Sequence, residues 1–304
     1  MTHTQPTTGS NYDQPNWADD ALEVNCPLCD YNLRGLSDPH CPECGYKFAW
    51  RDLLDPQRKG HPYLFELYRG SRFVAFWKTA FHGLRPRKFW KTLRADHRVV
   101  PERLALYATV VATLCLTAVV AIYLTMNMAQ FMAARAYNMY LSTARVGRIY
   151  LPASYYWMPY DTSIFQLGLA IGWPVLTFIS LMIFQVSMRR AKVNANHVLR
   201  CVIYSSDVLV WIALATLVCH AVYAVEIFLN QRGSVYWGFG FRMPRWDEAA
   251  LALAWATATV VFEYRLVIAY ASYLRFRHAL ATILASQFIV FLIACIGMFR
   301  DYVF

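Results

Sequence analysis

The feature that most constrains this fold is residues 104–134, a run of 31 residues without Asp, Glu, Lys, Arg or His. A helix rises about 1.5 Å per residue, and the hydrocarbon core of a bilayer, about 30 Å thick, needs about 20 residues. A helix over this run is therefore long enough to cross a membrane. A helix in a soluble core is seldom apolar on every face for so long. The run separates a polar, cysteine-bearing beginning from a largely apolar remainder.

Composition supports a membrane protein, since the 304 residues are 58% hydrophobic and the mean hydropathy is +0.29. The net charge of +10 indicates an anionic partner, either nucleic acid or an anionic membrane surface. The first 20 residues have neither the basic start nor the apolar core of a secretory signal. We therefore expect a disordered leader, residues 1–20, that stays in the cytoplasm.

Four of the eight cysteines form two CPxC pairs: Cys26, Cys29, Cys41 and Cys44. The pairs lie in segments that repeat each other, CPLCDYN and CPECGYKF, and a residue that tolerates a positive φ follows each pair (Asp30 and Gly45). Two such turns can place four thiolates around Zn²⁺. Chance pairs and a disulfide framework are the alternatives, but a repeated CPxC without a secretory signal favours zinc.

The segments CPLCDYNLRGL and CPECGYKF resemble the zinc ribbons and rubredoxin-like knuckles that open many uncharacterised bacterial membrane proteins. The resemblance implies a small β-type zinc ribbon, placed here at residues 21–59, whose metal is structural and has no open coordination position. Acidic residues outnumber basic ones between residues 20 and 50, and a Cys₄ zinc site adds negative charge. This argues against nucleic acid and favours a cytoplasmic protein as the partner of the ribbon.

Residues 60–103 form a basic segment before the first apolar run. Aromatic and apolar residues recur there with helical spacing between Phe73 and Leu84, which predicts an amphipathic helix over 71–84. Flanking cations favour a position in the headgroup layer of an anionic membrane. The alternative is a helix packed on the membrane domain with its cations merely solvated. The residues expected at the membrane surface are Arg72, Phe73, Phe76, Trp77, Lys78, Phe81, Arg85, Arg87 and Lys88.

The remainder, residues 104–304, is predicted to be an all-α polytopic bundle of about five transmembrane helices. The expected spans are residues 104–134, 163–188, 201–230, 249–274 and 279–299. With the N-terminus inside, 22 of the 29 Lys and Arg residues fall on the cytoplasmic side and 7 on the other. This asymmetry predicts a multi-pass protein of the inner (cytoplasmic) membrane with the ribbon in the cytoplasm and the C-terminus outside.

Five ionisable residues lie within the predicted spans: Asp207, His220, Glu226, Glu263 and Arg265. Such residues are candidates for function, but most lie near span ends, where structural pairing or snorkelling explains them. Only His220 lies well inside a span, and it shares no helix face with the acids of its own span. Since no HExxH or GxSxG motif occurs, structural pairing is the preferred interpretation.

The five-span layout behind a cytoplasmic domain resembles the Yip family of membrane-organising proteins in topology, although that family's Asp-Leu-Tyr/Trp-Gly-Pro motif is absent here. The resemblance implies membrane organisation without catalysis. Our first hypothesis is a non-enzymatic zinc-binding membrane protein whose ribbon contacts a cytoplasmic protein or organises the membrane domain. The alternatives are a small transporter or channel using His220, Glu226 and Glu263, and an intramembrane enzyme.

Overall fold

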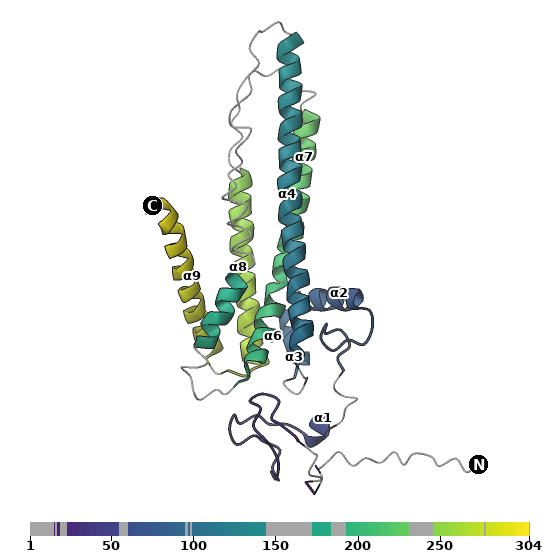
Figure 1. Ribbon diagram of the computed structural model, residues 1–304, viewed down its shortest axis with the longest axis vertical. Coiled ribbons are helices and arrows are strands. Elements are labelled where there is room, and N and C mark those ends of the chain that lie inside the picture. The colour runs from purple at the N-terminus through teal and green to yellow at the C-terminus, as the bar shows by residue number, and fades with distance from the viewer. Residues whose placement is uncertain are drawn as a thin grey trace, which may run out of the picture. The chain divides into compact units, whose positions relative to one another are not determined.

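The computed structural model describes residues 15, 17–18, 23–54, 60–94, 97, 99–143, 172–183, 193–230, 246–276 and 278–303. The chain divides into two compact units, and Figure 1 labels the helices that build them. Unit 1 comprises Met1–Tyr107, Thr177–Ser205 and Arg265–Phe304, and unit 2 comprises Ala108–Leu176 and Ser206–Tyr264.

Unit 1 contains the cysteine-bearing turns and most of the shorter helices. Its complete helices are α1 (Trp50–Leu54), α2 (Arg72–Gly83), α3 (Pro86–Thr92) and α9 (Ala279–Val303). It also holds α6 (Ala195–Ser206) up to Ser205, the first turns of α4 (Pro101–Thr143) and the end of α8 (Trp246–Ser272). Proline opens both α3 and α4, where its fixed φ suits the first helical position and its missing N–H costs no bond.

Unit 2 is built from the rest of α4, from α7 (Val208–Asn230) and from most of α8. Asp207 stands between α6 and α7, at the position before the first residue of α7, and its carbonyl accepts the amide of Val210 (3.1 Å). Asp is one of the residue types preferred there. The break therefore divides the apolar stretch Ala195–Val222 into two helices.

The core of unit 1 at the start of α4 is an aromatic chain that joins four helices and the residue after α8. Its centroid distances run from 5.0 to 5.8 Å, and its members in order of contact are Phe76, Tyr107, Tyr204, Phe89, Trp90 and Tyr273. These rings come from α2, α4, α6, α3 and the residue after α8. Each large ring buries 150–250 Å² of surface, about 4–6 kcal/mol by area transfer, so this cluster fixes α2 and α3 against the start of α4.

Two helical stretches of the described chain are long and apolar enough to cross a membrane, Pro101–Thr125 and Ala195–Val222. They coincide with the first and third predicted spans. The shorter apolar helices Gly172–Ile183 and Ala279–Ile293 lie within the second and fifth predicted spans. Two such stretches do not confirm the predicted count of five, which remains a prediction.

The β-type ribbon is not confirmed, because the described residues contain no strand. Each cysteine turn is closed by a single antiparallel bridge, Asn25 with Asn32 and His40 with Lys47. The arms on either side of each turn are too short to extend this pairing into a ladder. Most of the predicted leader and much of the predicted second span lie outside the described residues.

Candidate metal centre

The paired cysteines stand on two turns that are built in the same way. In the first turn the amide of Asp30 donates to the carbonyl of Cys26 (2.9 Å), and Asp30 has a φ of 60°. In the second turn the amide of Gly45 donates to the carbonyl of Cys41 (2.9 Å), and Gly45 has a φ of 70°. Asp and Gly tolerate this left-handed conformation, so the sequence repeat becomes a repeat of backbone geometry.

The two turns bring four sulfur atoms together. Sγ of Cys26 lies 3.6 Å from Sγ of Cys44, and Sγ of Cys29 lies 3.5 Å from Sγ of Cys41. All four atoms lie within 4.8 Å of one another. A tetrahedral Zn–S₄ site with bonds of 2.3 Å has sulfur–sulfur edges of about 3.8 Å, whereas a disulfide requires about 2.05 Å. The cluster therefore has the dimensions of a four-thiolate metal site and not of a disulfide pair.

Burial opposes charge on two of these thiols unless a cation is present. It raises the pKa of the Cys44 thiol to about 12 and the pKa of the Cys29 thiol above its ordinary value. A bound divalent cation stabilises thiolates and reverses this preference, so metal binding releases protons and acid favours metal loss. Four thiolates also complete a tetrahedron and leave no position for a substrate, which favours a structural metal.

The first cysteine turn is bonded to the beginning of α6. The backbone amide of Asn194 donates to the carbonyl of Leu28 (2.8 Å), and its side-chain amide donates to the carboxylate of Asp30. Nε2 of His197 lies 2.5 Å from the carbonyl oxygen of Pro27. Leu28 and Pro27 are the two residues between Cys26 and Cys29, so the cysteine turn itself carries the attachment.

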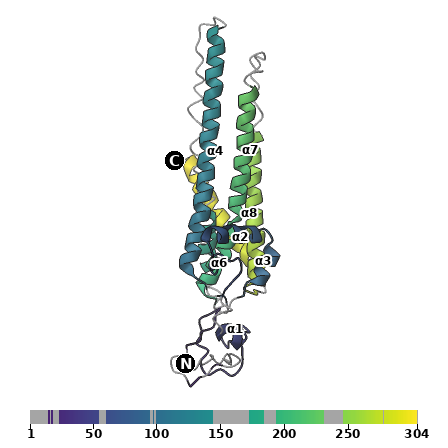
Figure 2. The ribbon, with the colours of Figure 1, turned by 90° about the vertical axis from the view of Figure 1, so that its right-hand side faces the viewer.

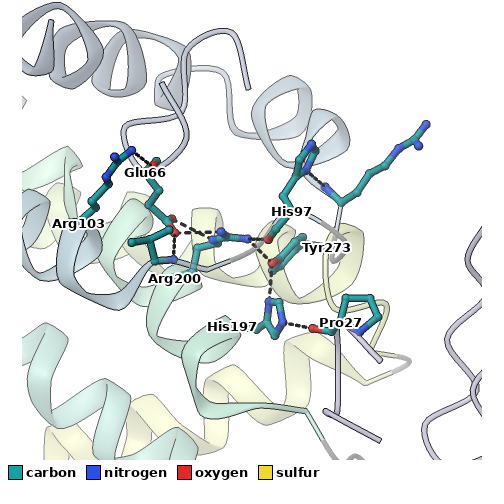
Figure 3. Close-up of polar contacts among 9 residues, drawn as sticks. Pro27, Glu66, His97, Arg103, His197, Arg200 and Tyr273 are labelled. Carbon is teal, nitrogen blue, oxygen red and sulfur yellow. Dashed lines mark hydrogen bonds and ion pairs between the residues drawn. The ribbon is translucent and has the colours of Figure 1, made fainter. Parts of the chain in front are cut away.

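The partners of His197 determine which of its nitrogens carries the proton. The carbonyl of Pro27 can only accept, so Nε2 is the donor. Nδ1 lies 2.6 Å from the hydroxyl of Tyr273, whose oxygen also accepts a bond from Nη1 of Arg200 (2.8 Å). The single hydroxyl proton of Tyr273 is therefore directed at Nδ1. The result is a continuous chain of bonds from the cysteine turn to Arg200 (Figure 3).

Arg200 forms a fully buried, bidentate ion pair with Glu66. Its Nε and Nη2 each lie 2.9 Å from one carboxylate oxygen, and both side chains are 0% exposed. Nη1 also donates to the carbonyl of His97 (3.0 Å), and the second carboxylate oxygen accepts the amide of Val100 (3.0 Å). Figure 3 shows these bonds converging from separate segments. Such a pair is stable in the interior only because further hydrogen bonds surround both charges.

This network was not among the sites predicted from the sequence. Arg200 looked like one cation of the short basic turn between two spans, and Glu66 lies in an aromatic loop without a motif. One signal was available, because Arg200 directly precedes the apolar run of the third span and a cation there needs a partner. The identity of that partner, 134 residues away, depends on the tertiary fold.

His61 is a second buried titratable group of unit 1. Burial, reinforced by the nearby charges of His97 and Arg200, lowers the pKa of His61 to about 4. Its Nδ1 accepts the amide of Leu64 (3.2 Å), which requires an unprotonated nitrogen. The imidazole is therefore neutral near pH 7, and protonating it would break a backbone bond.

The aromatic stripe of α2 divides between two environments. Phe76 is buried against Tyr107 with a centroid distance of 5.1 Å, whereas Phe73 is 73% exposed and Phe81 is 56% exposed. Trp77 is half-buried and contacts Phe73 and Phe81 at 6.3 and 6.2 Å. Figures 1 and 2 both show α2 running crosswise to the lower part of α4. The packing of Phe76 agrees with the alternative of a helix packed on protein, and the position in the headgroup layer remains a prediction.

The predicted surface cations of this segment are exposed. Lys78 is one of them, and its ammonium donates to the hydroxyl of Tyr68 (3.1 Å) and lies 4.8 Å from the centroid of that ring. The others with exposed side chains are Arg72, Arg85, Arg87 and Lys88.

Among the ionisable candidates of the apolar stretches, Asp207 and Arg265 are buried. Nη2 of Arg265 donates to the carbonyl of Tyr204 (2.7 Å), which joins the end of α8 to α6 within unit 1. This bond explains Arg265 as a structural contact between helices.

His220 lies on α7, half-buried, and its Nδ1 is 2.7 Å from the carbonyl of Thr216 on the same helix. The bond is local, as expected for a histidine that satisfies its own polar group. Glu263 is half-buried on α8, and the side chain of Glu226 lies outside the described residues.

Comparison of the chain with protein-family models, with curated proteins and with solved structures found no match. The resemblances to zinc ribbons and to the Yip family are therefore not supported by any named family, and the case for function depends on the site itself.

Proposed function

We propose that this chain is a non-enzymatic, zinc-binding integral membrane protein, in which the Cys₄ centre fastens a cytoplasmic module to the ends of the membrane helices. One observation carries the proposal: the metal-binding turn is bonded to the first residues of an apolar helical stretch. These bonds run from Asn194 and His197 to the residues between Cys26 and Cys29.

Zinc is the metal that the donor set favours. Four thiolates at tetrahedral spacing suit Zn²⁺ and iron, and zinc is typical of structural CxxC pairs in a reducing compartment. The saturated first shell supports a role in folding and anchoring. Dissociation of the metal would leave the two cysteine turns without a fixed conformation. The carbonyl of Pro27, which His197 binds, would then no longer be held in place.

Membrane insertion is supported by the surface of the apolar helices. Only 22% of the most apolar 18-residue stretch within Pro101–Thr125 is buried, and Leu124 is 60% exposed. Exposed apolar surface on this scale requires lipid or another protein as cover. Within the proposal the chain has five spans, with the N-terminus in the cytoplasm and the C-terminus outside, because this arrangement places 22 of the 29 cations inside.

The transporter alternative has less support. Its central residue, His220, is bonded to a carbonyl of its own helix, as expected of a structural histidine. Arg265 likewise has a structural partner in the carbonyl of Tyr204. In this proposal these residues pack the helices together, and the function of the protein lies in its cytoplasmic module.

The test combines metal analysis with membrane fractionation of the full chain. The wild type is expected in the carbonate-resistant membrane fraction with one zinc per chain. Cys26→Ser is expected to lose the zinc but stay in the membrane, whereas Cys219→Ser, which replaces an exposed cysteine outside the cluster, should keep both properties. Wild-type protein that is metal-free when purified under reducing conditions, or that is extracted by carbonate, would overturn the proposal.

Reporters fused at each end test the orientation separately. A cytoplasmic signal at the N-terminus and an external signal at the C-terminus are expected for five spans. Two cytoplasmic signals would require an even number of spans and would contradict this part of the proposal alone.

A further inference from the structure

A concave site with three arginines lies in unit 1, apart from the metal centre. It encloses a cavity of about 300 Å³ between the loop before α2, the N-terminal part of α2 and the first turns of α4. Its cations are Arg69, Arg72 and Arg103, and no acidic residue belongs to its described lining. Three positive charges around one hollow repel one another, so this arrangement favours an anionic occupant.

Glu66, the acidic residue bonded to Arg103, does not neutralise the positive charge of the cavity. Nη1 of Arg103 donates to the backbone carbonyl of Glu66 (2.7 Å), which orients the guanidinium without neutralising it. The carboxylate of Glu66 is already paired with Arg200 in the interior. The positive end of α2 adds to the potential, because the first turn of α2 has no acidic residue and Ser71 makes no side-chain cap.

Tyr68 supplies a polar group at the same cavity. Its oxygen accepts from Lys78 (3.1 Å), so its hydroxyl proton can be donated to an anion. Gly70 allows this placement, since a Cβ on Gly70 would come within 2.6 Å of Cε1 of Tyr68. The backbone is thus shaped to hold the phenol beside the arginines.

The surroundings of the cavity are apolar on the side of the candidate membrane helix. Leu106, on the first turns of α4, lines the cavity and is 36% exposed, and Phe73 follows Arg72 directly with an exposed ring. A soluble anion gains nothing from such surface. An amphiphile with an anionic head and acyl chains can satisfy both parts.

We propose that this cavity binds the phosphate group of an anionic phospholipid, with the guanidinium groups of Arg69, Arg72 and Arg103 as its ligands. Guanidinium groups bind phosphate oxygens in pairs, which a surface lysine cannot do. The acyl chains lie along the exposed apolar face of α2 and the first turns of α4. This inference rests on the proposed membrane location, and it adds a defined lipid site with one molecule per chain.

The experiment uses the full chain, purified with zinc in a neutral detergent, and measures binding of a short-chain fluorescent phosphatidylglycerol. The test variant is Arg69→Gln/Arg72→Gln, which changes two exposed side chains and leaves the core intact. The matched control is Arg87→Gln/Lys88→Gln, which removes the same charge from exposed positions of α3 outside the cavity lining. We expect at least about tenfold weaker binding for the test variant and less than about twofold for the control.

A second variant and two competitors sharpen the outcome. Arg103→Gln is expected to weaken binding to a similar degree, and an excess of zwitterionic phosphatidylcholine is expected not to displace the probe. Equal losses in the test and control variants, or displacement by phosphatidylcholine, would show only general surface attraction and would overturn the inference. Full displacement by inorganic phosphate at the same concentration would identify a free-phosphate site and would overturn the assignment to lipid.

Zinc content and membrane fractionation of each variant separate this inference from the proposed function. A variant that holds zinc, remains in the membrane and binds the lipid as the wild type does would refute the lipid site alone. A wild type that is absent from the membrane would refute the function first.

Discussion

The metal centre and the Glu66–Arg200 pair both gather charge in unit 1, but they do so in opposite ways. The four cysteines come from one short segment, with Cys26 and Cys44 only 18 positions apart. Glu66 and Arg200 are 134 positions apart and meet only when several helices are in place. The first centre is local and depends on an ion, whereas the second is built entirely from the tertiary fold.

This difference implies that the two centres fail differently. Removal of the metal should loosen the cysteine turns and leave the helices folded, because among the described residues the turns are tied to α6 through the bonds of Asn194 and His197. Loss of one partner of the buried pair should destabilise the packing of the helices around it, because the remaining charge stays in the interior without a partner. The bond between His197 and Pro27 connects the cysteine turn to the hydrogen-bond chain that leads to Arg200.

The largest expected effect is that of removing the metal. Structural Cys-rich zinc sites have apparent binding free energies of about 10–16 kcal/mol at neutral pH, so Cys41→Ser should abolish zinc retention. Hydrogen exchange should then increase over residues 23–54 and remain slow in α3 and α6. Cys115→Ser, outside the cluster, is the control. Equal loss of protection in the turns and in α3 would show one cooperative unit and would remove the contrast between the two centres.

The next effect is that of breaking the buried ion pair. Arg200→Ala leaves Glu66 buried without its partner and should lower the free energy of unfolding in detergent by about 3–5 kcal/mol. Arg94→Ala is the matched control. It removes an arginine that pairs with Asp52 at the same 2.9 Å distance but is 62% exposed, and it should cost about 0–1 kcal/mol.

Replacing both buried partners with apolar residues sharpens this result. Glu66→Leu combined with Arg200→Met removes both charges and should recover much of the stability lost in the single variant. Similar losses for Arg200→Ala and Arg94→Ala would mean that the pair is not the centre of this region.

A smaller effect is expected from the contact between the two centres. His197→Phe retains a ring of similar size but loses the bonds to Pro27 and Tyr273, at a cost of about 1–2 kcal/mol. Zinc should remain bound, because no ligand has changed, while limited proteolysis after residue 54 should accelerate. A variant that loses zinc as completely as Cys41→Ser would show that the attachment is needed to form the metal site.

The smallest effect concerns pH. The pKa of His61 is about 4 in the fold and close to 6.5 in an unfolded chain, so the unfolded state binds the proton first as pH falls. The free energy of unfolding should therefore decrease as pH falls from about 6.5 towards 4. His61→Asn, which keeps an acceptor for the amide of Leu64, should flatten this dependence between about pH 6.5 and 5.5. Parallel curves for the variant and the wild type would rule out His61 as the cause.

The cysteine centre could be predicted from the sequence because its information is local. Two CPxC pairs with Asp30 and Gly45 behind them specify two left-handed turns, and the structure has both. The apolar helices could also be predicted, since length and composition decide them. The β-type ribbon was a poorer prediction, because knuckle motifs specify turns and do not specify the length of the arms around them.

The rest depended on tertiary contacts. The spacing of apolar residues predicted a helix over 71–84, and α2 occupies Arg72–Gly83. Spacing could not show that Phe76 faces the protein while Phe73 and Phe81 do not, since periodicity defines a face and not its neighbour. The pairing of Glu66 with Arg200 could not be predicted either, because no sequence pattern near one residue indicates the other as its partner.

The central claim is a zinc ion held by the four thiolates of unit 1, and X-ray absorption at the zinc edge tests it most directly. Full-length protein, purified under reducing conditions, should contain one zinc per chain with four sulfur neighbours at about 2.3 Å and no nitrogen or oxygen neighbour. A first shell that contains nitrogen or oxygen, or a preparation whose cluster holds no zinc, would contradict the claim.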